Sequence, residues 1–346
     1  MKQGWEKISF EDSIVKVKYT TKIPSNDYLE QGLYPIVSQE EGLISGYWDN
    51  ANDVFKVSSP VVIFGDHTRI LKYVDFDFVL GADGVKILQP IKNINAKFFK
   101  LYLESCKIPS LGYSRHYKLL KELQVPVPPL AEQEKIVEEL DCLSGVIEKK
   151  REQLRELDAL VQSIFYTMFG DPITNEKGWE VKKWEEVFDT RTGKLNANVM
   201  NENGKYPFFT CSKDIFYIDT YAFDCEALLL AGNNATANYD VKYYKGKFNA
   251  YQRTYVLTLK DNSLYKFFKF ALENKLSLLQ EQSIGGMTKY LTLGILHQIE
   301  FIVPPFALQQ EFASKIEAIE KQKELIKQSI AETETLFNSR MNFYFN

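Results

Sequence analysis

The stretch GDHTR at residues 65–69 places a carboxylate, an imidazole and a guanidinium within four positions. Asp66 and His67 could do acid–base chemistry, because a carboxylate can orient an imidazole that moves a proton. The sequence offers no identifiable nucleophile or third member for such a set. A polar turn beside a glycine can also place His67, Thr68 and Arg69 against the phosphates or base edges of DNA. We favour this binding role, with a purely structural turn as the alternative.

A second polar stretch, GNNATANY at residues 232–239, occupies the matching place in an internal repeat of the chain. It supplies Asn233, Asn234 and Thr236 as candidates. An asparagine amide can pair with two atoms of an adenine edge. Asparagine is also common in turns for backbone reasons alone. Both interpretations stay open.

Further candidates lie in three polar segments. YSRHYK at residues 113–118 contains Arg115, His116 and Lys118, its aligned partner GMTKY at 286–290 contains Lys289 and Tyr290, and YQRTY at 251–255 contains Gln252 and Arg253. Arginine and glutamine suit guanine and adenine edges, whereas lysines suit phosphates. The lysines concerned are Lys72, Lys118, Lys247 and Lys289. Ordinary surface charge explains each of these residues equally well.

The sequence contains no complete motif for catalysis or metal binding. The four cysteines show no C-x-x-C spacing and the three histidines lie far from them in sequence, so neither zinc nor a disulfide framework is supported. Residues 303–306, VPPF, resemble the adenine-methyltransferase signature, but Val303 lacks the amide or carboxylate that would accept the adenine amino proton. Thr192-Gly193-Lys194 lacks the earlier glycine and following hydroxyl of a phosphate loop. We expect no catalytic residue, no metal and no cofactor in this chain.

Composition indicates an ordinary folded protein, with 45% hydrophobic and 25% charged residues among 346. No apolar run approaches the roughly 18 residues of a membrane helix, and MKQGWEKISF lacks a signal-peptide core. We therefore expect a cytoplasmic protein without a membrane partner. Residues 1–127 carry 16 basic against 15 acidic side chains and residues 171–303 carry 16 against 16, so both regions are nearly neutral. The net charge of −4 therefore comes from the two remaining segments, residues 128–170 and 304–346.

An internal repeat organises nearly the whole chain. Gly-Trp-Glu at residues 4–6 returns at 178–180, and KFFKLYLE at 97–104 returns as KFFKFALE at 266–273. VPVPPLAEQ at 125–133 returns in part as VPPFALQ at 303–309. From these prolines onward the offset between the copies stays at 176 residues. Each copy combines short β-branched runs between turn residues with a long Gly-poor tail, which predicts a mixed α and β part followed by a long helix.

The two tails show heptad patterns that predict pairing between helices on the order of 60 Å long. The first apolar seam is interrupted at Lys150, and the second is poorer, with Lys323, Thr333 and Arg340 at seam positions. An ordinary helix packed on a core is the alternative to mutual pairing. The seam residues are Ile136, Leu140, Leu143, Ile147, Leu154, Leu157, Val161 and Ile164 in the first tail, and Ile316, Ile319, Ile326, Ile330 and Phe337 in the second.

The duplicated order of motifs resembles the specificity subunit of type I restriction-modification enzymes. The matching residues are Val127-Pro128-Pro129-Leu130-Ala131-Glu132-Gln133, Met168-Phe169-Gly170-Asp171-Pro172, Asn175, Gly178-Trp179 and Val303-Pro304-Pro305. The resemblance covers essentially the full length. The second hinge departs from the family pattern at Leu308, where glutamate is usual.

The resemblance implies an α+β fold with two tandem α/β target-recognition domains, separated by two conserved helices that pair as an antiparallel coiled coil with pseudo-twofold symmetry. Domain 1 would span residues 1–127, spacer helix 1 residues 128–170, domain 2 residues 171–303 and spacer helix 2 residues 304–346. It also implies that each domain reads one half of a bipartite site in double-stranded DNA. The spacing of the half-sites would follow from helix length, as it follows from geometry in dimeric DNA binders.

The same resemblance implies a subunit without its own catalysis that recruits two methyltransferase subunits and restriction subunits. S-adenosylmethionine would then bind to the methyltransferase, and ATP and Mg to the restriction subunit. Two other functions stay open: a coiled-coil adaptor without a DNA role, and a protein with an enzymatic activity that its sequence does not reveal.

Overall fold

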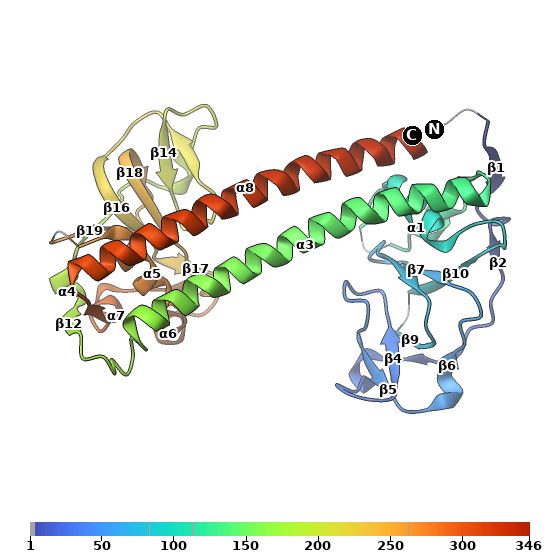
Figure 1. Ribbon diagram of the computed structural model, residues 1–346, viewed down its shortest axis with the longest axis horizontal. Coiled ribbons are helices and arrows are strands. Elements are labelled where there is room, and N and C mark those ends of the chain that lie inside the picture. Colours follow the sequence, from blue (N-terminus) through green and yellow to red (C-terminus); the bar gives the residue numbers. More distant parts are fainter. Residues whose placement is uncertain (1–3, 83, 113, 262) are drawn as a thin grey trace. The chain divides into compact units, whose positions relative to one another are not determined.

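The computed structural model describes residues 4–82, 84–112, 114–261 and 263–346 (Figure 1). Contacts divide the chain into two units. Unit 1 contains residues 1–152 and 326–346, and unit 2 contains residues 153–325. The two long helices, α3 (Leu130–Phe169) and α8 (Phe306–Phe345), have 40 residues each. Each unit contains part of both helices, so the units do not follow the order of the chain.

The described residues of unit 1 form three small sheets and two further α-helices. β1 (Glu6–Ser9) pairs with β11 (Gln124–Val127), and a four-stranded sheet has the order β2 (Ile14–Val15), β10 (Val85–Pro90), β7 (Val61–Gly65), β8 (Leu71–Val74). Another sheet has the order β3 (Lys22–Ile23), β9 (Phe78–Gly81), β4 (Tyr34–Val37), β5 (Gly46–Trp48), with β6 (Val54–Phe55) also on β9. The helices are α1 (Ala96–Ser105) and α2 (Tyr117–Leu120), and single 3-10 turns span Ser25–Asp27 and Ala51–Asp53.

Unit 2 is also mixed α and β, but its strands pair into different sheets. β12 (Glu180–Lys183) pairs with β21 (Glu300–Val303), and β17 (Asn233–Asn234) with β20 (Lys289–Tyr290). A six-stranded sheet has the order β13 (Phe188–Thr192), β19 (Thr254–Leu259), β16 (Phe223–Ala231), β18 (Val241–Ala250), β14 (Tyr206–Phe209), β15 (Phe216–Ile218). The remaining helices are α4 (Trp184–Val187), α5 (Tyr265–Glu273), α6 (Leu276–Gln282), α7 (Leu293–Leu296) and a 3-10 turn at Ala197–Val199.

One strand explains the main difference between the two units. In unit 2, β18 runs for 10 residues and pairs along its length with β16, then at its end with β14. In unit 1 the corresponding segment is interrupted between β8 and β9. β8 pairs with β7 and β9 pairs with β4, so unit 1 has two sheets where unit 2 has one.

The long helices pack against the globular cores by aromatic contacts. In unit 1, Phe98 of α1 contacts Trp5 and Phe345, with ring centroids 6.3 and 5.4 Å away. In unit 2, Phe267 of α5 contacts Phe169 at 5.1 Å. Offset stacking and edge contacts of this kind add to the burial of the rings. Trp5 and Phe345, which are far apart in sequence, therefore contact the same phenylalanine.

Within each unit α3 and α8 run antiparallel. In unit 1, Glu139 pairs with Arg340 while Lys150, further along α3, bonds Ser329, which comes earlier in α8. In unit 2, Asp158 pairs with Lys323 and Phe165 contacts Phe312. The polar seam positions predicted to weaken α8 thus each meet a polar partner on α3. All thirteen predicted apolar seam residues are buried or half-buried.

The junction after α3 is a helix cap. Gly170 has a φ of 74°, the left-handed conformation that glycine favours after a helix, and its N–H donates to the Tyr166 carbonyl at 2.8 Å. The Asn175 side chain bonds the backbone N–H and C=O of Trp179, at 2.9 and 2.8 Å. The indole N–H of Trp179 donates to the Phe169 carbonyl at 2.8 Å. The MFGDP-x-x-N-x-x-GW motif therefore ends the helix and turns the chain into the next domain.

The predicted α+β fold, with two α/β regions and two long antiparallel helices, is confirmed. The four-part division of the chain at residues 127, 170 and 303 stays a prediction, since the contact-based units have different bounds. No helix among the described residues is long and apolar enough to cross a membrane.

Candidate nucleic-acid interface

In unit 1 the GDHTR stretch forms a tight turn between β7 and β8. The Arg69 N–H donates to the Gly65 carbonyl at 2.7 Å, and Arg69 has a φ of 64°. The Thr68 hydroxyl donates to the Gln39 carbonyl at 2.7 Å, and the Arg69 guanidinium donates to the Ile108 carbonyl at 2.9 Å. Thr68 and Arg69 are exposed and His67 is half-buried. The turn thus presents polar side chains at the surface on a fixed backbone.

His116 fastens this turn to the segment before α2. Its imidazole is fully buried, Nδ1 lies 2.9 Å from the Asp66 carbonyl oxygen, and Nε2 accepts the Leu111 N–H at 2.9 Å. The buried Asp66 carboxylate accepts the Tyr117 N–H at 2.7 Å. Both ring nitrogens of His116 are therefore used inside the protein, which supports a structural role, and its contact with DNA stays a prediction. Asp66 likewise serves the backbone.

Lys72 also does not fit its predicted role. It is only 5% exposed, and its ammonium donates to the Gly42 carbonyl. Burial lowers the pKa of Lys72, because charge is costly away from water. A phosphate could reach this group only if the surrounding chain moved. By contrast, Arg115 and Lys118 are exposed on either side of the His116 anchor, while Tyr113, which opens the predicted segment, lies outside the described residues.

In unit 2 the pairing of β17 with β20 gathers most of the predicted residues. Asn233 lies opposite Tyr290, and Asn234 opposite Lys289. The Arg253 guanidinium lies over the Tyr290 ring, 5.4 Å from its centroid, a cation–π geometry. Strand pairing therefore makes a cluster that sequence proximity could not reveal.

The bonds of Asn234 support a backbone role in the turn over a contact with adenine. Its Oδ1 accepts the Thr236 N–H at 2.8 Å and the Thr236 hydroxyl at 2.9 Å. These bonds are those of an asparagine that stabilises a turn. Thr236 is exposed and Asn233 is half-buried at the surface of the same turn. The turn role is thus established for Asn234, while Asn233 and Thr236 stay candidates for contacts.

Gly232 allows the cluster to form. Its N–H donates to the Arg253 carbonyl at 2.8 Å, and a Cβ at this position would lie 2.4 Å from that oxygen. Only glycine permits such a close approach of the two backbones. The carbonyl of Gly232 in turn accepts the Leu291 N–H at 2.9 Å. The backbone of Gly232 therefore joins its own turn to the segments that contain Arg253 and Leu291.

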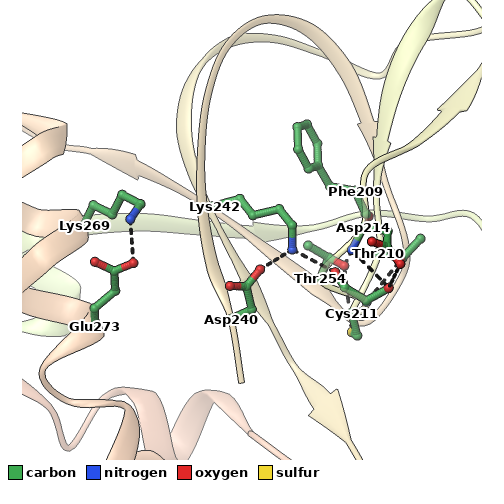
Figure 2. A network of polar contacts seen from close by, with 10 residues as sticks. Phe209, Thr210, Cys211, Asp214, Asp240, Lys242, Thr254, Lys269 and Glu273 are labelled. Carbon is green, nitrogen blue, oxygen red and sulfur yellow. Dashed lines mark hydrogen bonds and ion pairs between the residues drawn. The ribbon is translucent and has the colours of Figure 1, made fainter. Parts of the chain in front are cut away.

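A polar network holds the backbone of Arg253 in place, and Figure 2 shows its members Phe209, Cys211, Asp240, Lys242 and Thr254. The Cys211 thiol donates to the Arg253 carbonyl at 3.4 Å, and the Thr254 hydroxyl donates to the Phe209 carbonyl at 3.3 Å. Lys242 donates to the Ser212 carbonyl at 2.8 Å and pairs with Asp240. Sequence reasoning missed these residues, because nothing in their spacing marks them as supports for Arg253.

Two predicted residues of unit 2 lie outside the cluster core. Lys247 stands six positions along β18 from Val241, about 20 Å at the rise of a strand, and its ammonium lies over the Tyr221 ring at 4.7 Å. The exposed Gln252 side chain donates to Asn196 Oδ1 at 2.9 Å. Lys247 is therefore far along the strand from the cluster of Asn233, Arg253 and Tyr290. Gln252 lies at the edge of that cluster, because it directly precedes Arg253 in the chain.

These groups suit recognition of a polar, anionic ligand. They provide guanidinium, ammonium and amide donors on backbone that is fixed by neighbouring strands. Among the residues that the structure describes, no group of three or more His, Cys, Asp or Glu side chains is placed to hold a metal ion.

Comparison with known proteins identifies the family. A model described as the type I restriction modification DNA specificity domain matches the chain twice, at residues 2–158 and 176–335. The chain belongs to the type I restriction-modification specificity subunits. These subunits are the DNA-recognition components of their systems, and the two matches agree with the two copies seen in sequence and structure.

Curated relatives carry the same designation. The chain is 36% identical to the Escherichia coli EcoDI specificity subunit over 152 residues, which are 43% of this chain and 33% of that protein. It is 25% identical to the Methanocaldococcus jannaschii MjaIX specificity subunit over 241 residues, which are 58% of this chain and 54% of that protein. The chain thus matches between a third and about half of the length of these relatives.

Solved structures of specificity subunits share the fold. The crystal structure of the S subunit from M. genitalium has a TM-score of 0.64 at 16% identity, covering 98% of this chain and 95% of that chain. A chain from a study of complex assembly and conformational transition in a type I system has a TM-score of 0.53 at 15% identity, covering 100% and 98%. At such identities the likeness concerns the fold alone.

Proposed function

We propose that this specificity subunit reads a bipartite DNA site, with one half-site bound by each unit. The duplication of the polar turn carries this proposal. The turn after β7 presents Thr68 and Arg69, and the turn after β16 presents Asn233 and Thr236 at the matching place of the second unit. The two turns differ in sequence, so the half-sites differ as well.

The contacts divide by side-chain type. Arg69 and Arg115 in unit 1, and Arg253 with Gln252 and Asn233 in unit 2, are proposed for base edges. Lys118, Lys247 and Lys289 are proposed for phosphates, together with the hydroxyl of Thr68. His67, Thr236 and Tyr290 complete the two surfaces. Lys72, His116 and Asn234 have structural roles instead.

The long helices would set the distance between the half-sites. Each has 40 residues, on the order of 60 Å at 1.5 Å per residue. The polar seam residues Lys150, Lys323 and Arg340 each have a polar partner on the facing helix, which favours one register between α3 and α8. A single register between the helices would give a single distance between the two half-sites of the DNA.

The same helices would recruit two copies of a methyltransferase subunit in the cytoplasm, and restriction subunits would join that core. Apolar side chains stay exposed at equivalent positions of the two repeats: Leu130 and Phe306 are 43% and 49% exposed, and Leu160 and Leu336 are 45% and 49% exposed. Equivalent apolar surfaces suit two identical partners. On this proposal S-adenosylmethionine, ATP and Mg belong to the partners, and this chain carries no catalytic group of its own.

The decisive experiment is to co-express the chain with its methyltransferase subunit and map methylated adenines across a genome. One motif with two defined halves and a constant spacer is the expected result. The isolated chain should transfer no methyl group from S-adenosylmethionine. Robust transfer by the chain alone would contradict the scaffold role, and DNA binding by the complex that is absent or insensitive to salt would favour an adaptor.

A further inference from the structure

Gln133 and Gln309 occupy the same place in the two repeats, each five residues after the first residue of a Pro-Pro pair, Pro128 or Pro304. Both lie in the first turns of the long helices, where side chains are usually solvated. Yet they are only 0% and 2% exposed. A buried amide needs hydrogen-bond partners, since leaving it without them is costly.

Two partners are equivalent in both copies, and Gln133 has one more. Gln133 Nε2 donates to the Pro128 carbonyl at 2.7 Å and the Asn93 carbonyl at 2.9 Å, and Oε1 accepts the Asn95 N–H at 2.8 Å. In unit 2, Gln309 Nε2 donates to the Pro304 carbonyl at 2.9 Å, and Oε1 accepts the Leu264 N–H at 3.1 Å.

Asn95 and Leu264 are themselves equivalent residues, because each is the N-cap of its domain helix, α1 or α5. Each glutamine therefore ties together the proline hinge, the spacer helix and the start of the domain helix. An ion pair repeats beside each one: Lys97–Asp141 at 2.7 Å in unit 1 and Lys266–Glu317 at 3.0 Å in unit 2. The joint is thus duplicated although the recognition turns differ.

The glutamines constrain this joint more tightly than the ion pairs do. The Lys97 and Asp141 side chains are both 44% exposed, and such surface pairs fix geometry weakly. The amide bonds of Gln133 are buried and directional, and they act at both ends of one short side chain. A small rotation at this joint would displace the recognition turn of the domain.

We propose that Gln133 and Gln309 are positioning residues that fix the angle of each recognition domain on its spacer helix. They thereby limit which spacer lengths the protein accepts between its half-sites. The inference rests on the proposed bipartite recognition and adds a residue-level cause for its spacing.

The test uses the complex with the methyltransferase subunit and the variants Gln133→Met and Gln309→Met. Methionine has a similar length but no amide, so the shape is kept while the bonds are lost. Both variants should keep the two half-sites and accept spacers one base pair longer or shorter. Discrimination between spacers should fall by about tenfold, a change within reach of one lost buried hydrogen bond. The matched control is Gln310→Met, at the exposed neighbouring position.

A wild-type spacer preference in both variants would overturn the inference, and so would a uniform loss of methylation without spacer broadening. Should a methionine variant not fold, Gln133→Glu replaces it, because a carboxylate still accepts the Asn95 N–H but cannot donate to the two carbonyls. Misfolding of that variant too would show a purely structural role and contradict positioning. A wild-type complex that marks no bipartite motif would instead refute the proposed function itself.

Discussion

The ammonium group of Lys150 donates a hydrogen bond to the Ser329 hydroxyl, 2.5 Å away, within the apolar seam between α3 and α8. Thr333 Oγ1 accepts a second bond at 3.3 Å. A polar residue at a seam position favours one register, because a slipped register would bury it against apolar side chains, and it does so at a cost in stability.

The variant Lys150→Met should therefore be more stable than the wild type, by about 1 kcal/mol in the free energy of unfolding. Methionine fills the same space, and Thr333 keeps its own bond to the Ser329 carbonyl at 2.7 Å. Denaturant unfolding measures the change. Lys149→Met, at the exposed neighbouring position, is the control and should have little effect. A clear loss of stability in Lys150→Met would mean that the polar layer is net stabilising.

The sequence predicted the long helices well because heptads are a local, repeated signal. Residue 150 was recognised as a break in the seam, but its partners on α8 depend on register, which no local pattern specifies. The recognition turns were found by the repeat, whereas the cluster of Arg253 with Tyr290 arises from the pairing of β17 with β20. The burial of Lys72 and His116 was not predictable from the sequence, because burial of a polar side chain depends on packing across strands. Gln133 was named only as part of the proline motif, because its burial and its bonds to Asn93 and Asn95 depend on packing against α1.

His116→Phe should weaken recognition of one half-site only. Loss of the imidazole leaves the Leu111 N–H without its partner, while the Asp66 carbonyl keeps its bond from the backbone N–H of residue 116 at 2.8 Å; the cost in stability is about 1 to 3 kcal/mol. The turn that carries Arg69 then loosens. Binding of the complex to DNA with either half-site scrambled measures the effect. His297→Phe, at an exposed histidine of unit 2, is the matched control, and equal losses in both half-sites would contradict the prediction.

Arg253→Ala should reduce DNA affinity by about 1 to 3 kcal/mol and relax the sequence requirement in the other half-site, as expected for an arginine that reads a base edge. Arg253→Lys keeps the charge but loses the planar fork, so it should recover affinity without recovering specificity. Competition binding with single-base variants of the site gives both quantities. Lys321→Ala removes one exposed charge from α8 and should change neither. A uniform loss for every sequence would assign Arg253 to a phosphate.

Acid should weaken the ion pair between Glu139 and Arg340. The Arg340 guanidinium and the Tyr344 hydroxyl bond Glu139 and hold the pKa of its carboxyl below the usual value. A lowered pKa in the folded state stabilises the protein above the unfolded pKa of about 4.3, and this contribution is lost as the pH falls through the folded pKa. Arg340→Met should thus be less stable than wild type at pH 7 and approach it near pH 3, as followed by unfolding at several pH values. A difference that stays constant with pH would assign the effect of Arg340 to its packing on Phe343 and Tyr344.

Insertion of one heptad into each long helix should lengthen the spacer of the recognised site and leave both half-sites unchanged. Seven residues add about 10 Å to a helix, the length of about three base pairs of DNA. The insertions belong between Glu152 and Gln153 in α3 and between Leu325 and Ile326 in α8, where the two units divide. A heptad keeps the apolar seam in phase, whereas a five-residue insertion of similar composition breaks it and should abolish recognition. Methylome mapping distinguishes the outcomes. Altered half-sites would show that recognition is not modular, and an unchanged spacer would show that the helices do not measure the distance.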